Sequence, residues 1–218
     1  MTITRRTFNA TLAFAGLATA AGLTPLRLIG EALAQTAAEI ARPSSLGDMA
    51  LGDPKAAVTI VEYASMTCPH CATFTKEVFP KIKETYVDSG KVRFIFREFP
   101  LDLTAAAGSM LARCIADGNA DKYFAVVDLL FRQQDIWAVQ NPTAPLKRVA
   151  RQAGMGEQQF ETCLKDQKLL DAIKESQDYA VKTLKINSTP TFFVNETLVR
   201  GETSFEAFQK IIDPMLKG

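Results

Sequence analysis

Residues 58–71 read VTIVEYASMTCPHC, a strand-like run followed by two cysteines with two residues between them. The part from Val58 to Tyr63 is rich in β-branched and aromatic side chains, which is typical of a strand. Apolar residues then recur at helical spacing as far as Tyr86. The sequence therefore predicts that Cys68 and Cys71 lie at a strand-to-helix junction.

The predicted helix should run to about Val87. Pro80 lies inside it and should kink it without ending it, because the apolar pattern resumes after the proline. Two cysteines at this spacing can close a reversible disulfide. Cys68 would face the free N–H groups at the helix N-terminus, whose partial positive charge favours a thiolate. Position alone makes Cys68 a candidate nucleophile.

Composition excludes some partners. The chain has 218 residues, with 25 Lys plus Arg against 24 Asp plus Glu, and 47% of its residues are hydrophobic. A near-neutral chain of ordinary hydrophobicity gives no reason to expect nucleic acid or an anionic membrane surface as a partner.

The first 34 residues have the pattern of an export signal. Arg5 and Arg6 precede a modestly apolar run from Thr11 to Leu26. That run is shorter than the roughly 20 residues a membrane-spanning helix needs, so cleavage is expected near Ala34-Gln35. The paired arginines resemble the twin-arginine signal. We expect a periplasmic protein.

All four cysteines, at positions 68, 71, 114 and 163, follow this signal. Disulfides persist in the periplasm, so an even count with one close pair suggests one catalytic and one structural pair. Cys114 and Cys163 both fall on apolar helix faces and should point inward. Buried free cysteines are common, and a disulfide is the alternative that export favours.

The rest of the chain divides into segments. Residues 35–49 are polar and Ala-rich and read as a linker. A second buried strand is expected over 92–99, parallel to the first. Residues 104–184 show helical periodicity throughout and no strand.

A hairpin is expected over 191–194 and 197–200, with a capping box from Thr203 to Glu206 opening a final helix. A lone hairpin is marginally stable in water. We therefore expect residues 50–103 and 185–218 to form one α/β domain, with 104–184 as an all-helical insertion.

This order of elements resembles the thioredoxin fold, with a CXXC at the first helix and Thr189-Pro190 before a late strand. Pro69 and His70 between the cysteines, together with the helical insertion, narrow the resemblance to the DsbA-like periplasmic thiol-disulfide oxidoreductases.

The resemblance implies roles for the residues around the pair. Cys68 would be the attacking, partly exposed thiolate, and Cys71 the resolving thiol. His70 would donate a hydrogen bond to the thiolate or place positive charge beside it. Glu62, six residues before Cys68, would be a buried acid with a raised pKa that relays a proton to or from Cys71.

The resemblance also implies a cis Pro190, with Thr189 presenting its backbone to an extended substrate. Some α-proteobacterial DsbA-like proteins are similar in having a second cysteine pair, here Cys114 and Cys163.

The implied function is introduction of disulfides into reduced, unfolded exported proteins through a mixed disulfide at Cys68. A quinone-linked membrane oxidase would regenerate the pair, no cofactor or resident metal is expected, and a monomer is expected. The first alternative is an isomerase or reductase. A rival of another class is a periplasmic Cu(I) carrier, because Met66, Cys68 and Cys71 resemble the motif of copper chaperone domains. Zinc would need two more ligands near the pair.

Overall fold

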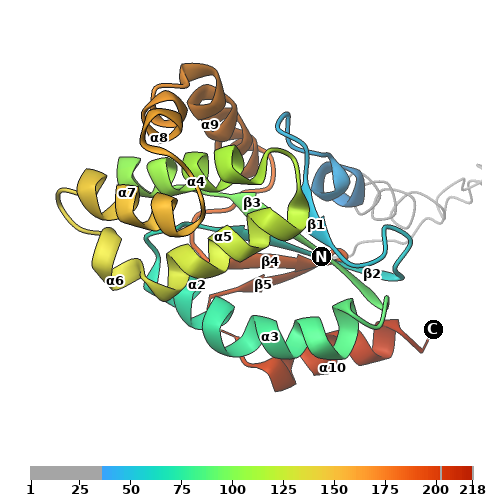
Figure 1. Cartoon of the computed structure of the whole chain (residues 1–218). Coiled ribbons are helices and arrows are strands. Elements are labelled where there is room, and N and C mark those ends of the chain that lie inside the picture. Colours follow the sequence, from blue (N-terminus) through green and yellow to red (C-terminus); the bar gives the residue numbers. More distant parts are fainter. Residues whose placement is uncertain (1–35, 202, 218) are drawn as a thin grey trace, which may run out of the picture.

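The computed structural model describes residues 36–201 and 203–217. Its five strands form one mixed sheet with the order β1-β3-β2-β4-β5 (Figure 1). The strands are β1 (Met49–Leu51), β2 (Val58–Ala64), β3 (Val92–Glu98), β4 (Thr191–Val194) and β5 (Thr197–Arg200).

One continuous helical stretch follows β2, made of α2 (Pro69–Thr73), a π-helical turn η1 (Phe74–Val78), α3 (Phe79–Ile82) and a second π-helical turn η2 (Lys83–Val87). The helices that follow β3 are α4 (Leu103–Ala116), α5 (Ala120–Arg132), α6 (Gln134–Trp137), α7 (Thr143–Gln152), α8 (Glu157–Leu164), α9 (Gln167–Lys182) and α10 (Phe205–Met215). The helix continues past Pro80, as predicted. In η1 the N–H of Phe79 bonds to the carbonyl of Phe74, five residues back.

The strand pairing confirms the predicted topology. β2 and β3 are parallel, with Glu62 opposite Phe96. β4 pairs with β2 in the antiparallel sense and places Phe192 on the other side of Glu62. β4 and β5 form the expected hairpin. Glu62 therefore lies in the middle of the sheet, with a paired strand on each side.

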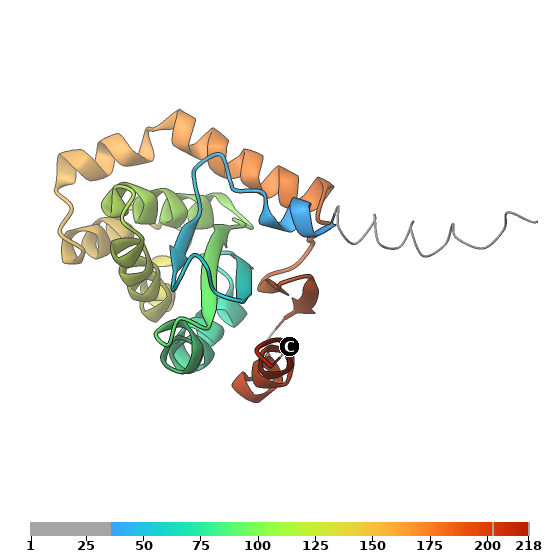
Figure 2. The same ribbon diagram turned by 90° about the vertical axis from the view of Figure 1, so that its right-hand side faces the viewer.

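Alternation along β2 divides the core between the two faces of the sheet. Ile60 and Ala64 belong to a large cluster that includes Phe74 and Phe208, from the helices that follow β2 and from α10. Val61 and Tyr63 belong to a smaller cluster with residues of α9 and of the 36–41 helix. Figure 2 shows this arrangement, with α9 and the 36–41 helix on one side of the sheet and α3 and α10 on the other.

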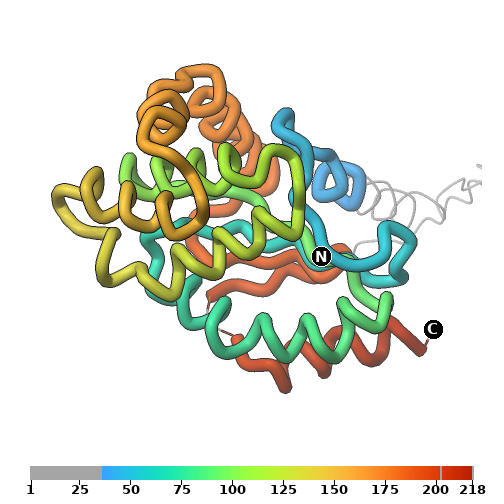
Figure 3. The backbone as a smooth tube through the Cα atoms, viewed as in Figure 1, coloured from blue at the N-terminus to red at the C-terminus, as the bar shows by residue number. Residues whose placement is uncertain are grey.

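Helices α4 to α9 lie between β3 and β4 in the chain, and no strand interrupts this part of it. Figure 3 shows the chain leaving the sheet after β3 and returning for β4. The large core cluster runs without a break from β2 and β3 into these helices, where it includes Tyr123, Phe131 and Trp137. The thioredoxin-like fold with a helical insertion is confirmed; the division into two units stays a prediction.

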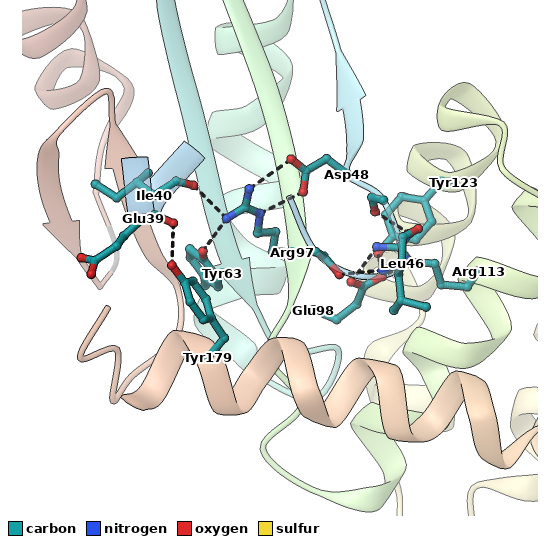
Figure 4. A network of polar contacts seen from close by, with 12 residues as sticks. Glu39, Ile40, Leu46, Asp48, Tyr63, Arg97, Glu98, Arg113, Tyr123 and Tyr179 are labelled. Carbon is teal, nitrogen blue, oxygen red and sulfur yellow. Dashed lines mark hydrogen bonds and ion pairs between the residues drawn. The ribbon is translucent and has the colours of Figure 1, made fainter. Parts of the chain in front are cut away.

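The prediction of a linker over 35–49 is wrong for its described part. Residues 36–41 are helical, Ile40 is 5% exposed, and β1 begins at Met49 and pairs with β3. Two buried arginines hold this segment (Figure 4). Arg97 donates to Asp48 through two bonds of 3.0 Å and to the carbonyl of Ile40 at 3.0 Å. Buried guanidinium groups need such partners, so the segment is part of the fold.

Arg113 of α4 holds the turn before β1. It donates to the carbonyls of Leu46 at 3.2 Å and Gly47 at 3.0 Å, and it pairs with the Glu98 carboxylate through two nitrogens. The Tyr123 hydroxyl donates to the same carboxylate at 2.6 Å. Each charge in this network is therefore compensated inside the protein.

The predicted capping box at Thr203 and Glu206 is also wrong. Ser204 is the N-cap of α10, and its hydroxyl accepts from the N–H of Ala207. Thr203 and Ser204 are both good N-cap residues.

None of the helices in the described residues is long and apolar enough to cross a membrane. The predicted signal over 1–34 lies outside those residues.

Candidate active site

The two cysteines lie where β2 gives way to α2. Cys68 is the N-cap of α2, and Cys71 lies one turn inside it. Both are free thiols in this structure. Cys68 is 6% exposed and Cys71 is 0% exposed, so the expectation of a partly exposed Cys68 is wrong for the dithiol form. Pro69 and His70, between them, are exposed at the surface.

Several groups lower the pKa of Cys68 to about 5. The largest contribution is a hydrogen bond with the Cys71 side chain; burial opposes it, and Thr189 and the backbone N–H groups of Cys71 and His70 lower the pKa further. Donors aimed at a sulfur stabilise its thiolate more than its thiol. His70 thus lowers this pKa through its backbone, and the role predicted for its ring stays a prediction.

The pKa of the second cysteine, Cys71, is shifted in the opposite direction. Burial raises the pKa of Cys71 well above its ordinary range, and the hydrogen bond with Cys68 and the charge of Glu62 raise it further. Glu62 is 1% exposed, and its Oε1 has no hydrogen-bond partner among the described residues. Burial, and then the charge of Cys68, raise the pKa of Glu62 well above its usual range. The predicted raised pKa of this acid is confirmed.

The segment before β4 forms the opposite wall. The peptide bond between Thr189 and Pro190 is cis, as predicted. The Cys68 thiol donates to the carbonyl of Thr189 at 3.4 Å. The Thr189 hydroxyl is buried and has no partner among the described residues, which leaves it available to the Cys68 thiolate. The fold thus places Thr189, which lies 121 positions after Cys68 in the chain, against the Cys68 sulfur.

Contacts that sequence reasoning missed hold the loop 65–68. The Thr67 hydroxyl donates to Asp102 at 2.7 Å, and Asp102 is the N-cap of α4. The Gln134 amide, at the start of α6, donates to the carbonyls of Met66 and Cys68. An Asp just before a helical stretch is a cap signal that could have pointed to Asp102. No motif marks Gln134.

The remaining predicted site residues lie elsewhere or stay untested. Cys114 and Cys163 form a disulfide between α4 and α8, as predicted. Met66 is fully buried, and a Cβ added at Gly108 would lie 3.2 Å from its Cβ. No group of three or more His, Cys, Asp and Glu in the described part of the chain could hold a metal ion. The alternative of a Cu(I) carrier stays a prediction, which direct titration of the protein with Cu(I) would test.

We expect a Glu62→Gln variant to be more stable than wild type at pH 7 and similarly stable near pH 4. The unfolded chain releases this proton above the ordinary pKa of the carboxyl, while the folded protein keeps it. Wild-type stability should therefore fall as the pH rises from the unfolded pKa through the raised folded pKa. The amide does not titrate, so its profile should lack this fall.

Urea unfolding from pH 4 to pH 8 measures both profiles. The matched control is Glu77→Gln, at an exposed position, which should follow the wild type. Parallel profiles for wild type and Glu62→Gln would show that the Glu62 pKa is not raised.

Comparison with known proteins fits this geometry. The family model described as Thioredoxin matches residues 44–214. A Rickettsia bellii protein named protein-disulfide oxidoreductase is 35% identical over 149 residues, which are 68% of this chain and 57% of that protein. This chain thus spans less than two thirds of that relative's length.

Two solved structures are similar over most of the chain. Wolbachia pipientis alpha-DsbA1 has a TM-score of 0.74 at 34% identity, covering 82% of this chain and 95% of that one. Oxidised BdbD from Bacillus subtilis has a TM-score of 0.70 at 23% identity, covering 81% of this chain and 97% of that one. This second similarity is one of fold. The chain therefore belongs to the thioredoxin family and, within it, to the DsbA-like proteins.

Proposed function

We propose that the protein is a thiol-disulfide oxidoreductase that donates the Cys68–Cys71 disulfide to reduced protein substrates. The observation that carries this proposal is the asymmetry of the pair. The pKa of Cys68 is lowered to about 5 while that of Cys71 is raised. One sulfur is a stable thiolate and a good leaving group, and the other stays protonated until it is needed.

This asymmetry favours oxidation of the substrate. At pH 7 the medium lies two pH units above the Cys68 pKa of about 5. Ionisation then stabilises the reduced pair by at most about 2.7 kcal/mol relative to an unperturbed thiol, which raises the potential by at most about 60 mV; solvent screening reduces both. A stabilised dithiol makes its disulfide a stronger oxidant, so the oxidase is favoured over the reductase.

The exchange has two steps. A substrate thiolate attacks the Cys68 sulfur of the disulfide, the Cys68–Cys71 bond breaks, and Cys71 leaves as a thiolate that takes up one proton. A second substrate thiolate then attacks the substrate sulfur of the mixed disulfide and expels Cys68 as a thiolate. Two electrons pass from the two substrate thiols to the cysteine pair.

The neighbouring residues have matching roles in this proposal. Glu62 is the buried acid that gives its proton to Cys71 and takes it back on re-oxidation. The backbone at Thr189 and Pro190 pairs with an extended substrate chain, as an added strand would. We propose that the ring of His70, an exposed residue between the two cysteines, donates a hydrogen bond to the Cys68 thiolate or places positive charge beside it. Unfolded chains suit such a site because their backbone is accessible.

Export to the periplasm is part of the proposal. Its support is the arginine-led apolar run over residues 1–34 and the Cys114–Cys163 disulfide, a bond that persists in oxidising compartments. The substrates would be newly exported reduced proteins, and a quinone-linked membrane oxidase would restore the disulfide. We propose that the protein acts as a monomer.

The test is the potential of the Cys68–Cys71 pair against glutathione buffers, together with oxidation of a reduced two-cysteine peptide. We expect a value less negative than about −180 mV and rapid peptide oxidation. A value near about −270 mV, the range of reductants, would overturn the oxidase. Efficient reshuffling of scrambled disulfides by a stable dimer would favour the isomerase.

A further inference from the structure

The side chain of Gln134 links the helical insertion to the backbone of the reactive cysteine. Its Nε2 donates to the carbonyl of Met66 at 2.9 Å and to the carbonyl of Cys68 at 3.0 Å. These residues are 68 and 66 positions away in the chain. Gln134 is the first residue of α6 and is half-buried.

The orientation of this amide is fixed by its surroundings. Both contacting atoms are carbonyl oxygens, which only accept hydrogen bonds, so the nitrogen must face them. The two N–H bonds of one amide group can serve both carbonyls. Gln134 therefore spans the loop 65–68 just before α2 begins.

Other contacts hold the same loop through its side chains. The Ser65 hydroxyl accepts from the N–H of Leu101 at 3.2 Å, and Thr67 donates to Asp102 at 2.7 Å. Met66 is fully buried beside Gly108. Gln134 differs from these in reaching the main chain of Cys68 itself.

The Cys68 carbonyl has two donors as a result. One is the N–H of Ala72 in the same helical turn, at 3.2 Å, and the other is Gln134. Two donors fix the plane of the peptide that follows Cys68. That plane sets where the Cys68 sulfur lies relative to the Thr189 carbonyl and to the N–H groups of His70 and Cys71.

We propose that Gln134 is a positioning residue for the reactive cysteine: from the helical insertion it holds the Met66 and Cys68 carbonyls and thereby keeps the Cys68 sulfur against Thr189 and the N-terminus of α2. The inference rests on Cys68 being the reactive thiol of the proposed function. It gives the insertion a part in setting the reactivity of the pair.

The test compares Gln134→Met, which keeps the size of the side chain but has no donor, with Gln134→Glu, whose carboxylate repels both carbonyls. The pH dependence of Cys68 alkylation by iodoacetamide and of thiolate absorbance at 240 nm reports the Cys68 pKa. Loss of the two hydrogen bonds should raise it by about one unit, seen as about a tenfold slower alkylation below the pKa. Gln134→Glu should raise the Cys68 pKa more than Gln134→Met does.

Gln133→Met is the matched control. Gln133 adjoins Gln134, and its Nε2 bonds to Gln152 on the exposed surface at 2.7 Å. It should leave the Cys68 titration unchanged. A lower melting temperature for Gln134→Met with an unchanged Cys68 titration would overturn the proposal in favour of a purely structural role. An equal shift in Gln133→Met would also overturn it.

Wild-type protein provides a second measurement that needs no variant to fold. In NMR spectra, the side-chain amide of Gln134 should exchange with water more slowly than that of Gln133 and should shift when the pair is oxidised. Equal exchange of the two amides would overturn the proposal. These readouts concern only Cys68 and Gln134, so they stand even if the potential of the pair shows that the protein is not an oxidase.

Discussion

A Cys71→Ser variant should lose all catalytic turnover and accumulate as a covalent adduct at Cys68. The Cys68 thiolate can still attack a disulfide and form a mixed disulfide. Resolution requires a second sulfur, and Cys71 is the one that hydrogen-bonds to Cys68. Serine keeps a hydroxyl donor beside the thiolate, so the pKa of Cys68 should stay low.

The measurement is intact-mass spectrometry after incubation with glutathione disulfide or a disulfide-linked peptide. One adduct per chain is expected, since Cys114 and Cys163 are already bonded to each other. Oxidation of a reduced two-cysteine peptide should fall to the uncatalysed rate.

The matched variant is Cys68→Ser, which should neither turn over nor form the adduct at a comparable rate. Its remaining thiol, Cys71, is 0% exposed and has a raised pKa, so it offers little accessible thiolate. Rapid adduct formation at Cys71 would show that the two cysteines have been assigned the wrong roles.

Segments with a clear residue-type, periodic or turn signal could be predicted from the sequence, and segments without one could not. The strands β2 and β3 and the hairpin of β4 and β5 followed from residue type and turn chemistry. β1 has only three residues, Met49–Leu51, too few to show a period. The helix over 36–41 is stabilised by Arg97 and by burial of Ile40, contacts that no local pattern reveals.

The residues of the active site also fall into those that could be predicted from the sequence and those that could not. Cys68, Cys71 and the cis Pro190 were predicted because a motif or a family resemblance marks them. Asp102 and Gln134 reach the loop 65–68 from 35 or more positions away, and their residue types are ordinary for helix starts. Such contacts depend on how the insertion packs on the sheet, which one sequence does not encode locally.

Arg113→Met should destabilise the fold by about 3–5 kcal/mol, because it leaves the Glu98 carboxylate buried without its counter-charge. The two side chains are 5% and 0% exposed. Methionine fills a similar volume but donates nothing to Glu98 or to the Leu46 and Gly47 carbonyls. Typical domains have a total stability of about 5–15 kcal/mol, so urea unfolding should show a large fall in the midpoint.

Three comparisons separate the charge effect from lost packing. Arg132→Met breaks an exposed pair with Asp128 and should change the stability by less than about 1 kcal/mol. The double variant Arg113→Met with Glu98→Gln has no buried charge at this site and should be more stable than Arg113→Met alone. Arg113→Met should also regain stability as the pH falls, because protonation neutralises the orphaned Glu98. If the double variant were the less stable one, the arginine would stabilise the protein mainly by holding the turn before β1, and the charge argument would be wrong.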